Sequence, residues 1–318
     1  RGMVESTGDP YTTFFTPAEA DEFVANLEGT FVGIGAEIGM KNGVLQVVSP
    51  LPETPAQRAG LQTGDQILSI DGEETATMSV EEAVSHIRGE KGTTVTLTMR
   101  RGETEPYDVV ITREKIVIDS VRTKIDDGIM TIAIFTFNGD TVELFNDAVN
   151  EALKSDVKGI VLDLRGNPGG LLKSAQSIAS AWVGYDTVVI EKEQEDARAL
   201  SGVSSPRIAH ISTVVLVNGG SASASEIVSG ALQDYGEATV VGTQTFGKGS
   251  VQDYREFQDG SAVKITVAEW FTPKGRTINE TGITPDVIVE VTLDDIQHGR
   301  DLQKEKAVEI LRLQIAEK

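Results

Sequence analysis

Cysteine is absent from this 318-residue chain, and histidine occurs only at His86, His210 and His298. The absence of cysteine excludes disulfides, thiol nucleophiles and thiolate metal sites. The scarcity of histidine restricts metal sites and catalytic triads that depend on an imidazole. The sequence therefore predicts neither a metal site nor a bound cofactor.

Positive charge is also scarce, because 28 Lys and Arg stand against 49 Asp and Glu, a formal charge of −21. Nucleic-acid affinity rests on cations that neutralise phosphates, so no nucleic acid is expected as a partner. No apolar run approaches the roughly 18 residues of a membrane-spanning helix. The start of the chain also lacks the features of a signal peptide, so we expect a targeting or anchor segment to be absent from this sequence.

A glycine-punctuated run from Ala59 to Gly72 reads AGLQTGDQILSIDG. Its pattern predicts a short helix ending at Gly60, a turn, a strand and a hairpin at Asp71-Gly72. Ser79 and Glu82 then form a predicted capping box for a helix. With the strands expected at 94–99 and 107–112, this stretch is a compact β-rich module.

The run from Ala59 to Gly72 closely resembles the PDZ domain signature, and residues 33–36 stand where that family keeps its carboxylate-binding loop. Glycine lets consecutive N–H groups turn toward a terminal carboxylate, although an ordinary strand-entry turn explains glycines here equally well. The resemblance implies that a peptide tail pairs with the adjoining strand beside a helix. A surface ion pair is the alternative role for the arginine that ends this helix. The predicted peptide-binding residues are Gly33, Ile34, Gly35, Ala36, Val80, Val84, Ile87 and Arg88.

Beyond Lys115, apolar strands alternate with helices, which is typical of a buried parallel sheet. The polar segment 191–210 is predicted to be a surface loop, and residues 301–316 form a predicted amphipathic helix. We therefore divide the chain into an N-terminal helical segment (1–30), a PDZ domain (31–115) and a protease-like core with a C-terminal helix (116–318).

Two segments of the core carry candidate catalytic residues. Residues 217–226 join a buried strand to a helix, where a serine hydroxyl lies beside unpaired N–H groups; alone, such a turn is most often a helix cap. Lys248 stands between two glycines and shares a face with Gln252 if the segment is extended. A lysine acts as a general base only when neutral, so burial must lower its pKa. Ser–Lys pairs are a known form of serine catalysis, whereas a lysine in a glycine-rich hairpin is the alternative.

Together these segments resemble the carboxyl-terminal processing proteases, a family of extracytoplasmic serine peptidases. The likeness continues through residues 8–12, 31–35, 163–170 and 282–286. It implies Ser223 as nucleophile, Lys248 as general base and Gln252 as the residue that orients Lys248. It also implies an oxyanion hole formed by Gly169, Gly170 and Ala224, although a simple strand-to-helix turn is the alternative for the two glycines.

The expected fold is α/β, a crotonase/Clp-protease-like core of stacked ββα units with an inserted PDZ domain. The expected function is a serine endopeptidase that binds the C-terminal tail of protein substrates and cleaves through an acyl-enzyme. Its expected partners are proteins with free, apolar C-termini, with a second copy of the chain and a regulatory protein as further candidates. Its expected location is the periplasm, cell-envelope surface or thylakoid lumen. The alternatives are a non-catalytic PDZ or ligand-binding scaffold and a Ser–His hydrolase that uses His210.

Overall fold

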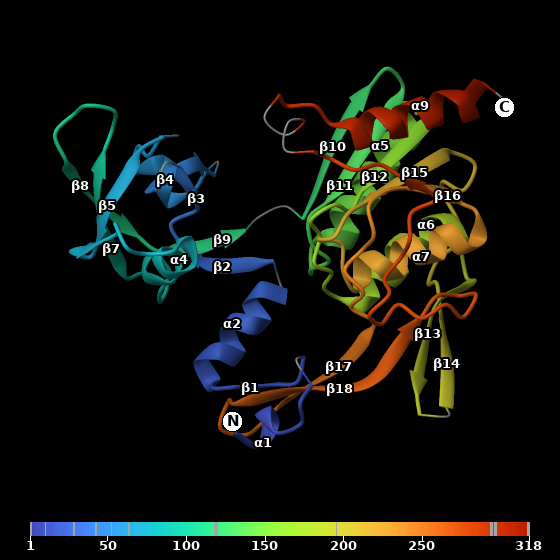
Figure 1. Ribbon diagram of the computed structural model, residues 1–318, viewed down its shortest axis with the longest axis horizontal. Helices are drawn as coiled ribbons and strands as arrows, with labels where there is room; N and C mark the ends of the chain where they lie inside the picture. Colours follow the sequence, from blue (N-terminus) through green and yellow to red (C-terminus); the bar gives the residue numbers. More distant parts are fainter. Residues whose placement is uncertain are drawn as a thin grey trace. The chain divides into compact units, whose positions relative to one another are not determined.

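The chain divides into two compact units, one from residues 1–29 with 119–318 and the other from residues 30–118. Their elements can be followed in Figure 1. The computed structural model describes residues 2–9, 11–27, 29–41, 43–51, 53–62, 64–117, 120–194, 196–292, 295 and 298–316.

The larger unit is built on a mainly parallel sheet with the order β10-β11-β12-β15-β16-β19 among the described residues. Only β10 runs antiparallel to its neighbour. The central strands are apolar and buried along their length, as the sequence pattern predicts. The bounds are β10 (Val121–Asp126), β11 (Ile129–Ile134), β12 (Gly159–Asp163), β15 (Ser212–Val217), β16 (Ala238–Gly242) and β19 (Val287–Ile288).

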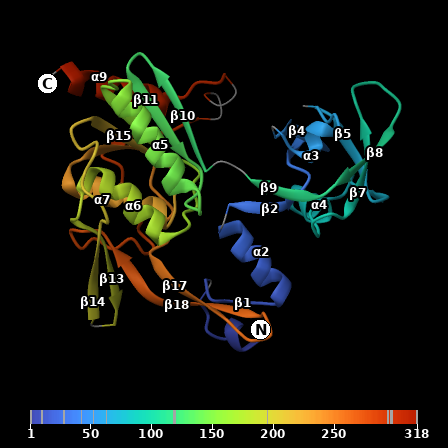
Figure 2. The ribbon, with the colours of Figure 1, turned by 180° about the vertical axis from the view of Figure 1, so that it is seen from behind.

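Helices cover both faces of this sheet. Three of them, α5 (Thr141–Lys154), α6 (Leu172–Val183) and α7 (Ala224–Tyr235), pack with one set of strand side chains (Figure 2). The alternate set packs against α9 (Leu302–Ala316), which confirms the predicted C-terminal helix. No helix in the described part of the chain is long and apolar enough to cross a membrane.

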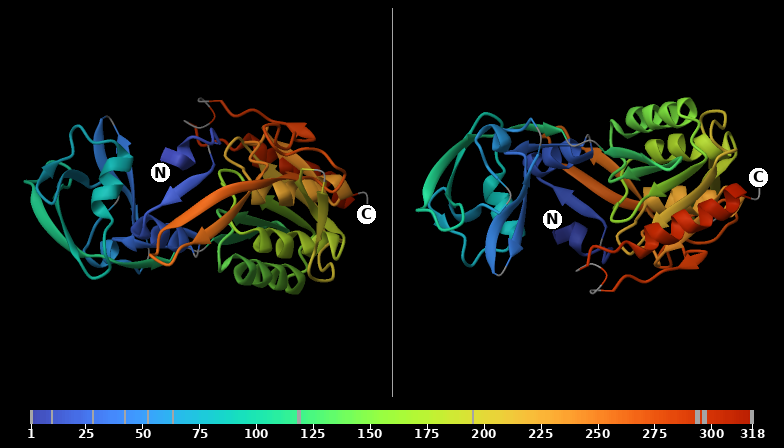
Figure 3. Two further views of the ribbon diagram at one scale, coloured as in Figure 1. Left: turned by 90° about the horizontal axis from the view of Figure 1, so that it is seen from below. Right: turned by 90° about the horizontal axis from the view of Figure 1, so that it is seen from above.

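A second sheet of the same unit extends along a long hairpin (Figure 3). The hairpin consists of β17 (Ser250–Glu256) and β18 (Ala262–Phe271), and β1 (Thr13–Phe15) pairs with β18. The N-terminal segment therefore contains a strand as well as α1 (Gly2–Glu5) and α2 (Pro17–Leu27). The surface loop predicted at 191–210 is wrong in its first half, because β13 (Thr187–Glu193) and β14 (Asp196–Ser201) form a hairpin there.

The smaller unit contains a sheet with the order β3-β4-β5-β7-β8, in which β6 pairs with β5, and a separate β2-β9 pair. The predicted hairpin and the predicted capping box of this unit are confirmed. Asp71 and Gly72 have φ of 49° and 87°, as a tight hairpin requires, and Ser79 and Glu82 form both halves of the capping box. The bounds are β2 (Thr30–Gly33), β3 (Ala36–Lys41), β4 (Val44–Pro50), α3 (Pro55–Arg58), β5 (Gln66–Ile70), β6 (Glu73–Glu74), α4 (Val80–Ile87), β7 (Thr94–Arg100), β8 (Tyr107–Thr112) and β9 (Glu114–Val117).

Candidate active site

Three loops meet at the carboxyl edge of the parallel sheet, and two of them hold Ser223 and Lys248. They follow β12, β15 and β16, which are neighbours in the sheet and run in the same direction. The carboxyl ends of parallel neighbours lie side by side, which is where ligands bind in open α/β sheets. The loops carry residues 166–170, 218–223 and 243–249.

Ser223 occupies the sharp turn between β15 and α7. Its φ is 52° and its ψ is −112°, a conformation that non-glycine residues rarely adopt. Such strain is characteristic of a serine held between a strand and a helix for attack on a carbonyl. The residue is half-buried, and Ala222 and Ala224 on either side have only small side chains.

Asn167 links the first two loops and was not singled out by the sequence. It is fully buried, and its side-chain amide donates to the Ile134 carbonyl at 2.8 Å. Its own carbonyl accepts from the Ala222 N–H and the Ser225 hydroxyl, each at 3.0 Å. Asn167 therefore holds the glycine loop against the turn that carries Ser223.

The three predicted oxyanion-hole residues lie beside this turn but differ in what their N–H groups do. A Cβ atom on Gly169 would lie 2.8 Å from Ser223 Cβ and 3.0 Å from the Ala224 nitrogen, so only glycine fits. The Gly169 N–H, however, donates to the Asn167 side chain at 2.9 Å. For Gly170 and Ala224, no hydrogen bond from the N–H is found within the described ranges. In this conformation these two N–H groups are the available donors.

Glu226 joins the nucleophile loop to the lysine loop. Its Oε2 accepts from the Ser223 N–H at 2.7 Å and from the Lys248 N–H at 2.9 Å, so the two nitrogens lie at most 5.6 Å apart. Its Oε1 accepts from the Thr245 hydroxyl at 2.6 Å and the Gly247 N–H at 2.7 Å. The side chain is fully buried, and burial raises the pKa of Glu226, whereas these hydrogen bonds oppose that shift.

Lys248 lies in the loop before β17 and is half-buried. Burial lowers the pKa of Lys248 below its ordinary value of 10.5, while the nearby Glu226 opposes the shift. Its Nζ lies 5.4 Å from the centre of the Tyr11 ring. A lysine with a lowered pKa beside a serine loop has the property that a general base requires.

The structure does not support the geometric argument that paired Gln252 with Lys248. The strand β17 begins at Ser250, and a bulge separates Val251 from Gln252, so alternation along a strand does not relate the two side chains. The Gln252 amide instead donates to the Ser250 hydroxyl at 2.6 Å and to its carbonyl at 3.1 Å. Its role as the orienting residue stays a prediction.

His210 does not lie beside Ser223. It precedes the amino end of β15, whereas Ser223 follows the carboxyl end of the same strand. The length of β15 alone separates those ends by about 17 Å at ~3.3 Å per residue. A Ser–His pair formed by these residues is therefore incompatible with the fold.

In the smaller unit, the predicted carboxylate loop is formed by residues 33–36. Gly35 has a φ of 75°, and its carbonyl accepts from the Thr54 hydroxyl at 2.8 Å and the Leu51 N–H at 2.9 Å. No hydrogen bond from the N–H of Ile34 or Gly35 is found in the described part of this unit. The protein therefore satisfies the Gly35 carbonyl, while the N–H groups of Ile34 and Gly35 stay available to an anion.

The helix α4 packs beside β3, which forms one edge of the described sheet. Val80 and Val84 on this helix are half-buried, whereas Ile87 is 4% exposed and belongs to the core of the unit. Arg88 follows the helix, and its guanidinium carbon lies 5.1 Å from the centre of the Phe31 ring. Arg88 therefore makes a cation–π contact with Phe31, and its role in peptide binding stays a prediction.

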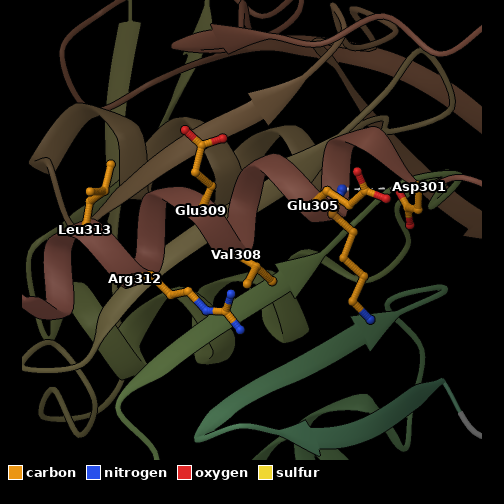
Figure 4. A pocket seen from close by; sticks show the side chains of 7 residues that line it. Asp301, Glu305, Val308, Glu309, Arg312 and Leu313 are labelled. Carbon is orange, nitrogen blue, oxygen red and sulfur yellow. Dashed lines mark hydrogen bonds between the residues drawn. The ribbon is translucent and has the colours of Figure 1, made fainter.

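A pocket of about 600 Å³ lies along the outer side of α9 (Figure 4). Arg312, which lines it, pairs with Asp127 at 3.0 Å. None of the predicted site residues lines this pocket. Within the described ranges, no group of three or more His, Cys, Asp or Glu side chains is placed to hold a metal ion.

Two family models match parts of this chain. Residues 128–289, about half of the chain, match the model of peptidase family S41, and residues 46–101 match the PDZ domain. The chain is 43% identical over 292 residues to a probable CtpA-like serine protease of Staphylococcus aureus (strain N315), covering 91% of this chain and 59% of the relative. A protein of the same description from Staphylococcus saprophyticus is 39% identical over the same shares. The chain thus spans about three fifths of the length of these relatives.

Among solved structures, the photosystem II D1 C-terminal processing protease is similar. It is 30% identical with a TM-score of 0.61, covering 91% of this chain and 80% of that one. The predicted mixed α/β fold with a PDZ domain is therefore confirmed.

Proposed function

Because the chain belongs to peptidase family S41, a family of serine-type hydrolases, we propose that it cleaves protein substrates near their C-termini through an acyl-enzyme on Ser223. The observation that carries this proposal is the bridge from Glu226 to the backbones of both Ser223 and Lys248. It fixes the loop of a nucleophile next to the loop of a half-buried lysine. An extracytoplasmic location belongs to the same proposal.

In the first step, the neutral Lys248 amine takes the proton of the Ser223 hydroxyl as the oxygen attacks the scissile carbonyl carbon. We expect the Gly170 and Ala224 N–H groups to donate to the resulting oxyanion and stabilise it. Collapse of the tetrahedral intermediate breaks the C–N bond, and the Lys248 ammonium returns its proton to the leaving amine. Water then attacks the acyl carbon while Lys248 accepts one of its protons. Collapse of this second tetrahedral intermediate breaks the C–O bond to Ser223, and the Lys248 ammonium returns the proton to the Ser223 oxygen, which restores the free enzyme.

A serine-reactive fluorophosphonate separates this protease from a non-catalytic binding scaffold. The reagent is expected to label Ser223 in the intact protein, with the modified peptide identified by mass spectrometry, and Ser223→Ala should remove the label. A comparison of protein C-termini after incubation with active and Ser223→Ala enzyme would then identify the substrates. Absence of labelling in a folded protein that still binds peptides would favour the scaffold.

The pH profile of kcat/KM is expected to have a rising limb that follows the deprotonation of Lys248. Only the unprotonated amine accepts the serine proton, and the limb should lie below pH 10.5 because burial lowers the pKa of Lys248. The measurement is kcat/KM against pH for a peptide substrate. The exposed His210 supplies the control, because His210→Ala should leave the limb in place, and a shifted limb in that variant would contradict the assignment.

We also propose that the smaller unit binds the C-terminal tail of the substrate. The available N–H groups of Ile34 and Gly35 suit a terminal carboxylate, and the edge of β3 suits pairing with an extended peptide. Val80 and Val84 on α4 offer apolar surface to the last side chain of the tail. These contacts favour substrates with free, apolar C-termini.

Amidation of a substrate C-terminus is expected to weaken its binding about tenfold to a hundredfold. The amide removes the charge and leaves loop N–H groups unpaired, at a cost of roughly 1–3 kcal/mol. The measurement is the affinity of the wild-type protein for one peptide with a free and an amidated end. Equal affinities would contradict tail recognition.

Two glycines provide a matched pair of variants for the same experiment. Gly35 and Gly43 both have a φ of 75°, but a Cβ atom on Gly35 would collide with Thr54, whereas one on Gly43 would meet nothing within 4 Å. Gly35→Ala should therefore abolish the preference for the free C-terminus, and Gly43→Ala should keep it.

A further inference from the structure

The N-terminal segment reaches the side chain of the proposed catalytic lysine. The Lys248 Nζ lies 5.4 Å from the centre of the Tyr11 ring, within the range at which an aromatic face attracts a cation. The motif containing Tyr11 belongs to the sequence resemblance, but the proposed catalytic steps give it no part.

A carboxylate holds the segment around Tyr11 on the β17–β18 hairpin. Asp9 accepts hydrogen bonds from the Tyr11 N–H at 3.2 Å, from the Thr266 hydroxyl at 2.6 Å and from the Thr12 hydroxyl. The Thr12 hydroxyl accepts in turn from the Thr266 N–H at 3.1 Å. The strand β1 then continues along β18. Asp9 and Thr12 therefore hold the backbone around Tyr11 against β18.

A second lysine lies near the first. Lys264 on β18 is opposite Tyr254 on β17, and its Nζ lies 5.7 Å from the Phe15 ring centre and 5.3 Å from the Phe23 ring centre. These rings stack at 5.0 Å, and Tyr254 stacks on Phe23 at 5.2 Å. Burial lowers the pKa of Lys264, the charge of Lys248 lowers it further, and Asp9 opposes both.

We propose that Tyr11 is a positioning residue of this protease: its ring covers the Lys248 amine, while Lys248 and Lys264 each disfavour a positive charge on the other. The proposal rests on the proposed role of Lys248 as the general base. A desolvated lysine next to another cation is a known way to obtain a neutral amine near physiological pH. The segment that precedes the PDZ domain is then part of the catalytic apparatus.

The Tyr11 ring affects the amine in two opposite ways. Its face favours the charged ammonium, whereas its bulk excludes water and favours the neutral amine. Burial outweighs the opposing Glu226 in lowering the pKa of Lys248, and the proposal attributes part of that burial to the Tyr11 ring. Removal of the ring should therefore admit water and raise the pKa of Lys248. Removal of the Lys264 charge should raise it as well.

The direct test measures the pKa of the Lys248 amine by competitive labelling with acetic anhydride across pH, read by mass spectrometry in the Ser223→Ala background. Tyr11→Ala is expected to raise this pKa by about one unit, whereas Tyr11→Phe, which keeps the ring, should leave it unchanged. Lys264→Met should also raise it, and Lys264→Arg, which keeps the charge, should not. In enzyme that keeps Ser223, each unit by which the pKa of Lys248 rises should lower kcat about tenfold at pH values below that pKa. KM should change little.

An unchanged Lys248 pKa in folded Tyr11→Ala protein would overturn the proposal. Should Tyr11→Ala fail to fold, Tyr11→Val takes its place, because the smaller side chain also uncovers the amine, and an unchanged Lys248 pKa in that variant would overturn the proposal as well. The labelling result is independent of turnover, so it separates this proposal from the one on which it rests. If Lys248→Ala keeps normal turnover, the Ser–Lys mechanism fails, while a raised pKa in Tyr11→Ala would still establish that the ring covers the amine.

Discussion

Replacement of either Ser223 or Lys248 by alanine should lower kcat/KM by about 10⁴-fold or more, and the double variant should be no worse than either single variant. The hydroxyl and the amine act in one step, so the loss of either group removes the same transition-state stabilisation. Both side chains are half-buried, so their truncation to alanine should leave the fold intact. The measurement is peptide hydrolysis, with circular dichroism and thermal unfolding as evidence of folding.

The exposed pair Ser155 and Lys158 supplies matched controls for these substitutions. Ser155→Ala and Lys158→Ala remove the same chemical groups at the surface and should keep full activity. Normal turnover by Lys248→Ala would contradict the Ser–Lys mechanism directly. Additive losses in the double variant would show that the two side chains act in separate steps.

Local signals in the sequence predict local structure well. The hairpin at Asp71-Gly72, the capping box of Ser79 and Glu82, and the helix at 302–316 each depend on residues close together in the chain. The β13–β14 hairpin has only a weak signal, because β14 is almost entirely exposed and its alternating positions carry small alanine side chains. Its stability comes from backbone pairing with β13, which the side chains do not encode.

The candidate site shows the same division between local and long-range information. Ser223 and Lys248 stand out as residue types in unusual surroundings. The contacts that relate them depend on the order of strands, because β15 lies between β12 and β16. The capture of the Gly169 N–H by Asn167, and the turn of the Gln252 amide toward Ser250, follow from details of loop packing. Spacing along the chain does not contain that information.

Glu226 illustrates how a local and a long-range explanation can be separated. As the third residue of α7, it has the position at which any carboxylate stabilises a helix N-terminus. The structure adds that both of its oxygens are fully used, each accepting two hydrogen bonds from groups of the nucleophile and lysine loops. A carboxylate only accepts, so an amide at this position would direct its two N–H bonds at groups that also donate.

Glu226→Gln should therefore lower kcat by about 10²-fold or more and the free energy of unfolding by about 2–4 kcal/mol, because buried donors lose their acceptor and the two loops separate. Glu143 is the matched control, since it is the third residue of α5 and is exposed. Glu143→Gln removes only the helix N-terminal charge and should change stability by less than about 0.5 kcal/mol and activity not at all. The measurements are urea unfolding and peptide hydrolysis of both variants. Equal, small effects at the two positions would mean that Glu226 serves its helix alone, and the alignment of Ser223 with Lys248 would then depend on the contacts of Asn167 and the hairpin.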